Sequence, residues 1–251
     1  MTMRRPLYED IGVGYQAVRQ EDPRVREQLH APLAGVMSLL NVGAGTGSYE
    51  PRGPRLVAIE PSPTMIRQRA SDAAPVARGV AQHLPFADDA FAGSMAFLTV
   101  HHWPDPIAGL AELRRVTVGP VVVFTFDNAV HSRQWLVTDY LPELLALDEG
   151  LPSPDTIATA LGGGRVDVVP VPADCVDGFC HAWWRRPGAY LSPAVRAGIS
   201  GIARQPVAVV DRAMAQLERD LEDGTWIRAH ADLLDRDSID AGYRLVVSPG
   251  R

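Results

Sequence analysis

The most constraining feature of the sequence is a short apolar run that leads directly into a glycine-rich turn. Residues Leu39–Val42 precede the pentapeptide Gly43–Gly47, which has glycine at its first, third and fifth positions. Glycine lets the backbone approach a ligand closely, because no Cβ atom stands in the way. Doubly wound α/β sheets bind nucleotides at turns that follow a central strand. The pattern therefore predicts an α/β fold with a nucleoside site near residues 41–60.

The remaining strand signals support this fold class. From about residue 37, short apolar runs alternate with helical patterns, as is typical of βαβ units. One run, Val121–Asp127, is rich enough in β-branched residues to suit a strand buried on both faces. We expect strands at Val36–Val42, Arg55–Glu60, Val76–Val80, Phe91–Val100, Val121–Asp127, Val166–Val171 and Tyr243–Ser248.

Capping residues and apolar spacing locate the expected helices. The segment 8–36 is predicted to be helical, with Asp22 as a cap and Pro32 near its end. Ser62 and Asp105 each precede a proline and should open further helices. Another helical pattern covers Trp135–Leu147. In the helix after Asp105, the side chains expected to face the sheet are Ile107, Leu110, Leu113 and Val116.

A helical stretch of about sixty residues separates the last two expected strands. One of its helices should start at Ser192–Pro193, and a longer one should end at Gly224. The longer helix has one apolar face, so it should pack on the sheet or over its active edge. The residues of this face are Val207, Val210, Met214, Leu217 and Leu221.

A carboxylate at the end of the second expected strand strengthens the nucleoside prediction. Glu60 follows Gly43 by 17 residues and can accept hydrogen bonds from both ribose hydroxyls. Ser48 stands where a dinucleotide site would have its third glycine, which favours a nucleoside without a pyrophosphate. The alternative is an ordinary tight turn beside a surface glutamate.

Composition excludes several classes of function. The net charge is −6, which disfavours nucleic acid as the main partner. The sequence contains no lysine, so it has neither a Schiff-base amine nor a P-loop lysine. Cys175 and Cys180 lack CxxC spacing, and no HxxxH or HExxH pattern occurs, so we expect no metal site. Without a signal peptide or a long apolar segment, the protein is expected to be cytoplasmic and not bound to a membrane.

Four ordered motifs resemble class I S-adenosylmethionine-dependent methyltransferases, and within them the small bacterial branch of ubiquinone and menaquinone C-methyltransferases. The resemblance implies a doubly wound, mostly parallel, seven-stranded Rossmann-like sheet with a helical insertion before the last strand. It divides the chain into an N-terminal helical lid (1–36), a cofactor-binding core (37–180), a substrate cap (181–240) and the final strand (241–251). The motifs are Asn41–Glu50, Val57–Ser62, Gln82–Phe86 and Leu98–Trp103.

The resemblance also implies a role for individual residues in binding S-adenosylmethionine. The glycine-rich turn would lie beneath the methionine part, Glu60 would bind the ribose, and an N-terminal tyrosine segment would close over the carboxylate. Three positions depart from the family, since Asn41, Val80 and Ala92 stand where acidic residues are usual. The implied cofactor-binding residues are Tyr8, Tyr15, Arg19, Asn41, Gly43, Ala44, Gly45, Thr46, Gly47, Glu60, Pro61, Ala81, Gln82, Leu98 and Thr99.

The expected activity is methyl transfer to a small-molecule acceptor. His101 and His102 follow the fourth strand and either remove the acceptor's proton or brace the loop. Trp183, Trp184 and Trp226 either line the acceptor pocket or belong to the core. Two other functions stay open at this point: a non-catalytic binding module or cyclase with the same fold, and a NAD-dependent oxidoreductase.

Overall fold

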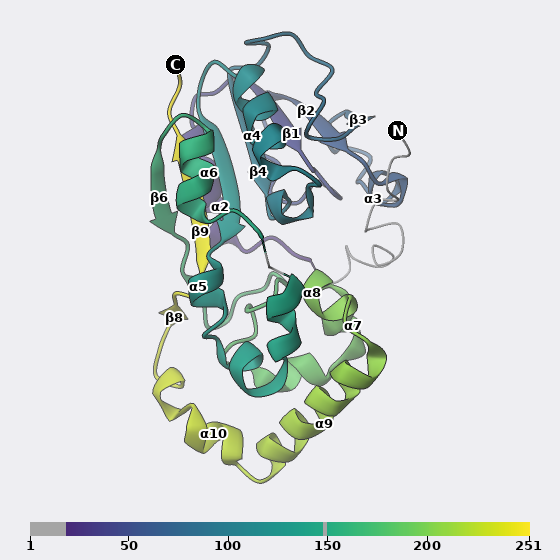
Figure 1. The fold of residues 1–251 in the computed structure, drawn as a ribbon, viewed down its shortest axis with the longest axis vertical. Coiled ribbons are helices and arrows are strands. Elements are labelled where there is room, and N and C mark those ends of the chain that lie inside the picture. The colour runs from purple at the N-terminus through teal and green to yellow at the C-terminus, as the bar shows by residue number, and fades with distance from the viewer. Residues whose placement is uncertain (1–18, 148–149) are drawn as a thin grey trace.

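The computed structural model describes residues 19–147 and 150–251. Its centre is a seven-stranded sheet with the order β3-β2-β1-β4-β5-β9-β6 (Figure 1). All neighbouring strands are parallel except β9, which runs antiparallel to β5 and β6. This is the predicted doubly wound, mostly parallel sheet. The strands are β1 (Ser38–Val42), β2 (Arg55–Glu60), β3 (Val76–Arg78), β4 (Gly93–Phe97), β5 (Val121–Phe126), β6 (Arg165–Val168) and β9 (Tyr243–Ser248).

Helices cover both faces of the sheet. The helices α4 (Pro106–Arg115) and α6 (Pro154–Ala160) pack on one face, where Leu40 and Val123 belong to the same buried cluster. The helix α2 (Pro23–His30) packs on the other face. A fourth helix, α3 (Pro63–Arg67), follows β2. The predicted caps are confirmed, because the side chains of Asp22, Ser62 and Asp105 each accept a hydrogen bond from a first-turn backbone N–H.

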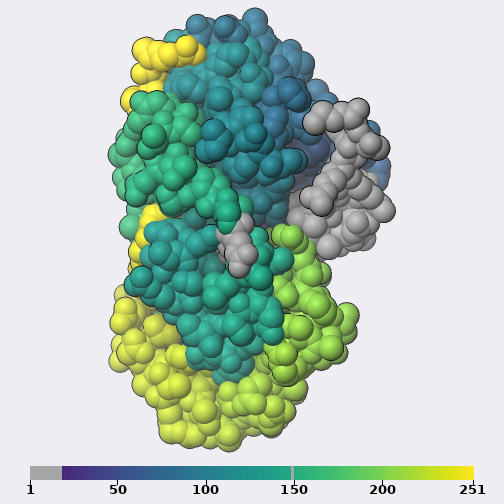
Figure 2. Space-filling view, in the orientation of Figure 1, coloured from purple at the N-terminus to yellow at the C-terminus, as the bar shows by residue number. Residues whose placement is uncertain are grey.

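A separate group of helices lies beyond one end of the sheet (Figure 1). Its core combines Trp135 and Leu144 with Tyr190, Leu217 and Trp226, so residues before β6 and residues after it share one buried cluster. In Figure 2 the teal and the yellow-green parts of the chain accordingly lie together at this end. The helices are α5 (Asn128–His131), α7 (Pro193–Ala197), α8 (Ser200–Ala203), α9 (Val207–Glu222) and α10 (Thr225–Ala229).

Several expected elements differ in extent from the prediction. Residues 31–33 form a 3₁₀ turn that contains Pro32, so α2 ends at His30. The segment Trp135–Leu147 is not one α-helix, because Pro142 separates a π-helical turn (Leu136–Tyr140) from a 3₁₀ segment (Pro142–Leu147). The expected strand Val166–Val171 is divided into β6 and β7 (Val171–Pro172), and β7 pairs with β8 (Ser238–Ile239).

Two apolar side chains were wrongly expected to be buried. Ile107 is 47% exposed in the first turn of α4, whereas Leu110, Leu113 and Val116 are buried. Val207 is 75% exposed as the first residue of α9. Among the described residues, none of the helices is both long enough and apolar enough to cross a bilayer.

Candidate functional site

A cleft of about 1240 Å³ contains the residues that follow β1, β2 and β4. The strand order reverses at this point, because β1 lies between β2 on one side and β4 on the other. Open α/β sheets bind their ligands in the crevice at such a reversal. The cleft is also lined by Arg19 and Arg204, which come from distant parts of the chain.

The glycine turn after β1 approaches the turn after β4 very closely. Gly43 has φ +71°, and a Cβ atom built on it would lie 1.9 Å from Oγ1 of Thr99. Only glycine fits this position, because any other residue would be strained at this φ and its Cβ would clash with Thr99. The backbone N–H groups of Gly43 and Ala44 donate to the carbonyl of Ile59 at 2.8 and 3.1 Å. The turn is therefore held against β2 as well as β4.

Glu60 brings its carboxylate from the end of β2 to this turn. Its Oε2 accepts a hydrogen bond of 2.8 Å from the backbone N–H of Gly45, and its Oε1 accepts one of 2.8 Å from Ser62. The residue is 4% exposed and lines the cleft. A buried carboxylate and a glycine turn thus share one wall of the cleft.

Most residues predicted to bind the cofactor line this cleft. Asn41 and Gly47 are not among the lining residues, and Tyr8 and Tyr15 lie outside the described residues. The predicted residues that line the cleft are Arg19, Gly43, Ala44, Gly45, Thr46, Glu60, Pro61, Ala81, Gln82, Leu98 and Thr99.

Asn41 instead supports the glycine turn from outside the cleft, through Glu50 and Arg69. Its Nδ2 donates to Oε1 of Glu50 at 3.0 Å. The same carboxylate accepts two hydrogen bonds of 2.8 Å from Nη2 of Arg69, and both side chains are less than 10% exposed. Arg69 also donates to the carbonyl of Gly45 at 3.3 Å. No motif in the sequence indicates this buried ion pair, since its two residues are 19 positions apart.

A second, smaller cavity of about 90 Å³ adjoins the cleft. The two cavities share Leu98, His101 and His102, together with Arg19 and Arg204. Sequence reasoning missed Arg204, which follows α8 and belongs to no recognisable motif. The other lining residues of the second cavity include Phe126, His131, Leu144, Phe179, Cys180, Ile199 and Tyr243.

The two predicted catalytic histidines lie where the cavities meet. They belong to the 3₁₀ turn Val100–His102 after β4, and their ring centroids are 3.8 Å apart. Nδ1 of His101 is buried and has no hydrogen-bond partner among the described residues. Burial lowers the pKa of His102 to about 4 and the pKa of His101 well below its usual value. Both rings are therefore neutral near pH 7.

Arg19 is fixed beside the cleft by a buried network. Its Nε donates to Asp177 at 2.6 Å, and the hydroxyl of Tyr49 donates to the same carboxylate at 2.9 Å. The Tyr49 hydroxyl in turn accepts a hydrogen bond of 3.1 Å from the backbone N–H of Asp22. The network joins the start of the described chain to the segment just after the glycine turn.

The tryptophans considered for the acceptor pocket belong to the interior instead. Trp184 and Trp226 are 1–2% exposed, and none of the three tryptophans lines either cavity. Trp184 donates to the carbonyl of Val171 at 3.1 Å, and the guanidinium of Arg186 lies 4.4 Å from the ring centroid of Trp183. Their role is packing.

Comparison with known proteins decides the family. Residues 40–119 match the family model of a methyltransferase domain. The crystal structure of a candidate methyltransferase from an antibiotic biosynthesis pathway of Anabaena variabilis is 30% identical, with a TM-score of 0.86. The alignment covers 92% of this chain and 98% of that one. The chain belongs to the S-adenosylmethionine-dependent methyltransferases. This assignment replaces the alternative of a NAD-dependent oxidoreductase.

More distant solved structures share the methyltransferase fold. A candidate sarcosine dimethylglycine methyltransferase from Galdieria sulphuraria is 16% identical, with a TM-score of 0.52 over 92% of this chain and 91% of that one. A chain in the complex of the Haloferax volcanii Trm112 activator with a methyltransferase is 19% identical, with a TM-score of 0.52 over 67% and 81%. No curated protein matches the sequence significantly.

The cleft of this methyltransferase fits S-adenosylmethionine, the family's cofactor. Gly43 and Gly45 line the cleft without side chains, and the Glu60 carboxylate lies at the same wall. The volume of about 1240 Å³ exceeds the usual range for a pocket that holds one small ligand. The cleft therefore has room for the cofactor and part of an acceptor.

Proposed function

We propose that this methyltransferase transfers the methyl group of S-adenosylmethionine to a small-molecule acceptor that reaches into the second cavity. The observation that carries the proposal is the shared wall of Leu98, His101 and His102 between the two cavities. An acceptor at this wall lies next to the cofactor and is surrounded mostly by apolar side chains. The net charge of −6 is a further argument against a nucleic-acid acceptor.

The cleft residues have distinct roles in this proposal. Glu60 accepts hydrogen bonds from the ribose hydroxyls, the role that an acidic residue at this strand end has in dinucleotide sites. The turn Gly43–Thr46 lies beneath the methionine part, and Ala81 and Gln82 contact the adenine edge. Arg19 lies at the cofactor carboxylate, where its salt bridge to Asp177 keeps it in place. When bound, the cofactor supplies an electrophilic methyl group.

The protein's own contribution to the reaction is alignment, exclusion of water and acceptance of a proton. The acceptor atom has to lie in line with the methyl group at about 3–3.5 Å. The segments around Leu144 and Ile199 exclude water from the second cavity. Nδ1 of His101 accepts the proton of a hydroxyl acceptor, since the neutral ring has an acceptor nitrogen.

We also propose the corresponding division of the chain. Residues 37–180 form the cofactor-binding core with the last strand at 241–251, and residues 181–240 form the substrate cap. The segment around Trp135 and Leu144 lies within residues 37–180 but packs into the core of that cap.

The test is a transfer assay with methyl-labelled S-adenosylmethionine and a library of small hydroxyl, amine and carbon acids. Label should appear in a low-molecular-weight product, and mass spectrometry should show the addition of one methyl group. Glu27→Gln, a change on the exposed side of α2, is the control and should retain full activity. Cofactor binding without transfer to any library member would contradict the proposal and favour the binding-module alternative.

A further inference from the structure

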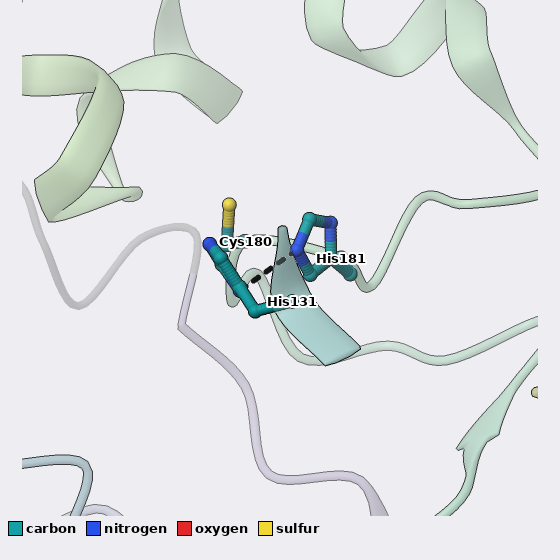
Figure 3. Close-up of side chains that lie close together, drawn as sticks. All are labelled: His131, Cys180 and His181. Carbon is teal, nitrogen blue, oxygen red and sulfur yellow. Dashed lines mark hydrogen bonds between the residues drawn. The ribbon is translucent and has the colours of Figure 1, made fainter. Parts of the chain in front are cut away.

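Three potential metal ligands converge beside the second cavity. They are Nδ1 or Nε2 of His131 and His181 and Sγ of Cys180, and the ligand atoms all lie within 4.8 Å of one another. Nδ1 of His131 is 2.9 Å from Nε2 of His181. Figure 3 shows the two imidazole rings joined by this hydrogen bond, with Cys180 beside them. His131 and His181 are at most 5% exposed.

Packing around β9 fixes the two segments that carry these side chains. His131 is the last residue of α5, which Asp127 caps directly after β5. A Cβ atom on Gly242 would lie 3.0 Å from the backbone nitrogen of His131, so the absence of a side chain lets α5 approach the start of β9. The backbone N–H of His181 donates to the hydroxyl of Tyr243 at 3.4 Å. Both segments thus meet at the first residues of β9.

We propose that His131, Cys180 and His181 form a Zn²⁺ site. Two imidazoles and a thiolate are nitrogen and sulfur donors, which suit zinc and not the oxygen-seeking Mg²⁺ or Ca²⁺. Zinc lies about 2.0–2.1 Å from nitrogen and about 2.3 Å from sulfur, so tetrahedral ligand atoms are about 3.3–3.6 Å apart. The observed separations bracket this range, from 2.9 Å between the two nitrogens to at most 4.8 Å within the cluster.

The fourth coordination position of this zinc site faces the second cavity. His131 and Cys180 line that cavity, whereas His181 holds the metal from the buried side. Three protein ligands and one open position are typical of zinc sites that bind an exogenous ligand. The site is separate from the cofactor cleft, and its metal binding is measured without cofactor or acceptor. A failure of zinc binding is therefore distinguishable from a failure of the proposed methyl transfer.

The test is equilibrium dialysis of the metal-free full chain against Zn²⁺, followed by elemental analysis. We expect one zinc per chain, and an affinity at least about 100-fold lower for Cys180→Ser and for His181→Gln, since each removes a ligand. Cys175→Ser is the control: it removes the other cysteine, which lies outside the cluster, and it should bind zinc normally. No zinc in the wild-type protein, or equal binding by Cys180→Ser, would overturn the proposal.

Cobalt substitution gives a second measurement that needs no variant. The Co²⁺-loaded wild-type protein should show thiolate-to-cobalt charge-transfer absorption and the intense visible bands of a four-coordinate ion. Addition of azide should shift the visible bands, because the open position accepts it. An octahedral spectrum without a thiolate band, or a spectrum unchanged by azide, contradicts the proposed site.

Discussion

Glu60 and Gly45 are joined by a hydrogen bond of 2.8 Å between a side-chain carboxylate and a backbone N–H. The bond links the end of β2 to the turn after β1, so the carboxylate and the glycine turn keep a fixed relative position. The buried pair of Glu50 and Arg69 supports the same turn from the other side. This wall of the cleft is therefore held by hydrogen bonds on both sides, which we expect to lower the entropic cost of ligand binding.

The close approach of Gly43 to Thr99 predicts a large effect of a single methyl group. Gly43→Ala should lower the free energy of unfolding by about 2–3 kcal/mol more than Gly35→Ala, as measured by urea denaturation. Gly35 is the matched control, because it has a similar φ of +78° but no atom within 4 Å of a Cβ. Equal losses would mean that backbone strain alone acts at residue 43 and that the contact with Thr99 is unimportant.

The buried ion pair predicts strong coupling between its two partners. Arg69→Met and Glu50→Gln should each destabilise the protein by about 3 kcal/mol, because each leaves an uncompensated buried group. The double variant should lose clearly less than the sum. Arg52→Met provides the control, since Arg52 and Asp72 form an exposed pair at 3.5 Å and should contribute under about 1 kcal/mol. Additive losses at residues 50 and 69 would contradict the assigned pairing.

The pKa of His102 predicts how stability changes with pH. Because the folded protein keeps the ring neutral down to about pH 4, while the unfolded chain protonates it near pH 6.5, the unfolded state binds more protons in between. The free energy of unfolding should therefore fall as the pH decreases from 6.5 to 4, by at most about 3–4 kcal/mol from this residue. Urea midpoints of His102→Gln should depend less on pH than those of the wild type. Identical pH dependence would contradict the shifted pKa.

The role of His101 is tested by kinetics with an acceptor found in the transfer assay. His101→Gln should lower kcat by about 10²–10⁴-fold for a hydroxyl acceptor, because the proton then has no acceptor group. The KM for S-adenosylmethionine should hardly change. His230→Gln, a histidine outside both cavities, should behave as the wild type. An unchanged kcat would assign His101 to bracing the loop after β4.

Local patterns in the sequence predict the sheet and the place of the glycine turn well. The ends of β2 and β9 and the caps at Asp22, Ser62 and Asp105 follow from short-range rules, because the residues that decide them are neighbours in the chain. The position of Glu60 follows in the same way from the strand that precedes it.

Features that depend on distant residues are not predictable by such rules. The ligand cluster joins His131 to His181 across 50 positions, so a search for ligand spacing led to the expectation of no metal site. Arg204 reaches the cleft through the packing of α8, and Asn41 faces Glu50 because Arg69 holds that carboxylate. Trp184 packs inward, where its indole N–H donates to the carbonyl of Val171, a partner that composition does not reveal.

The central claim is that the glycine turn and Glu60 together bind an adenosyl amino acid. Calorimetric titration of the full chain with S-adenosylhomocysteine tests it most directly. The account predicts one site per chain, and affinity lowered by about 10–100-fold in Glu60→Ala, the loss expected for hydrogen bonds to a charged group. Absence of binding to the wild-type protein, or equal binding by Glu60→Ala, would contradict it.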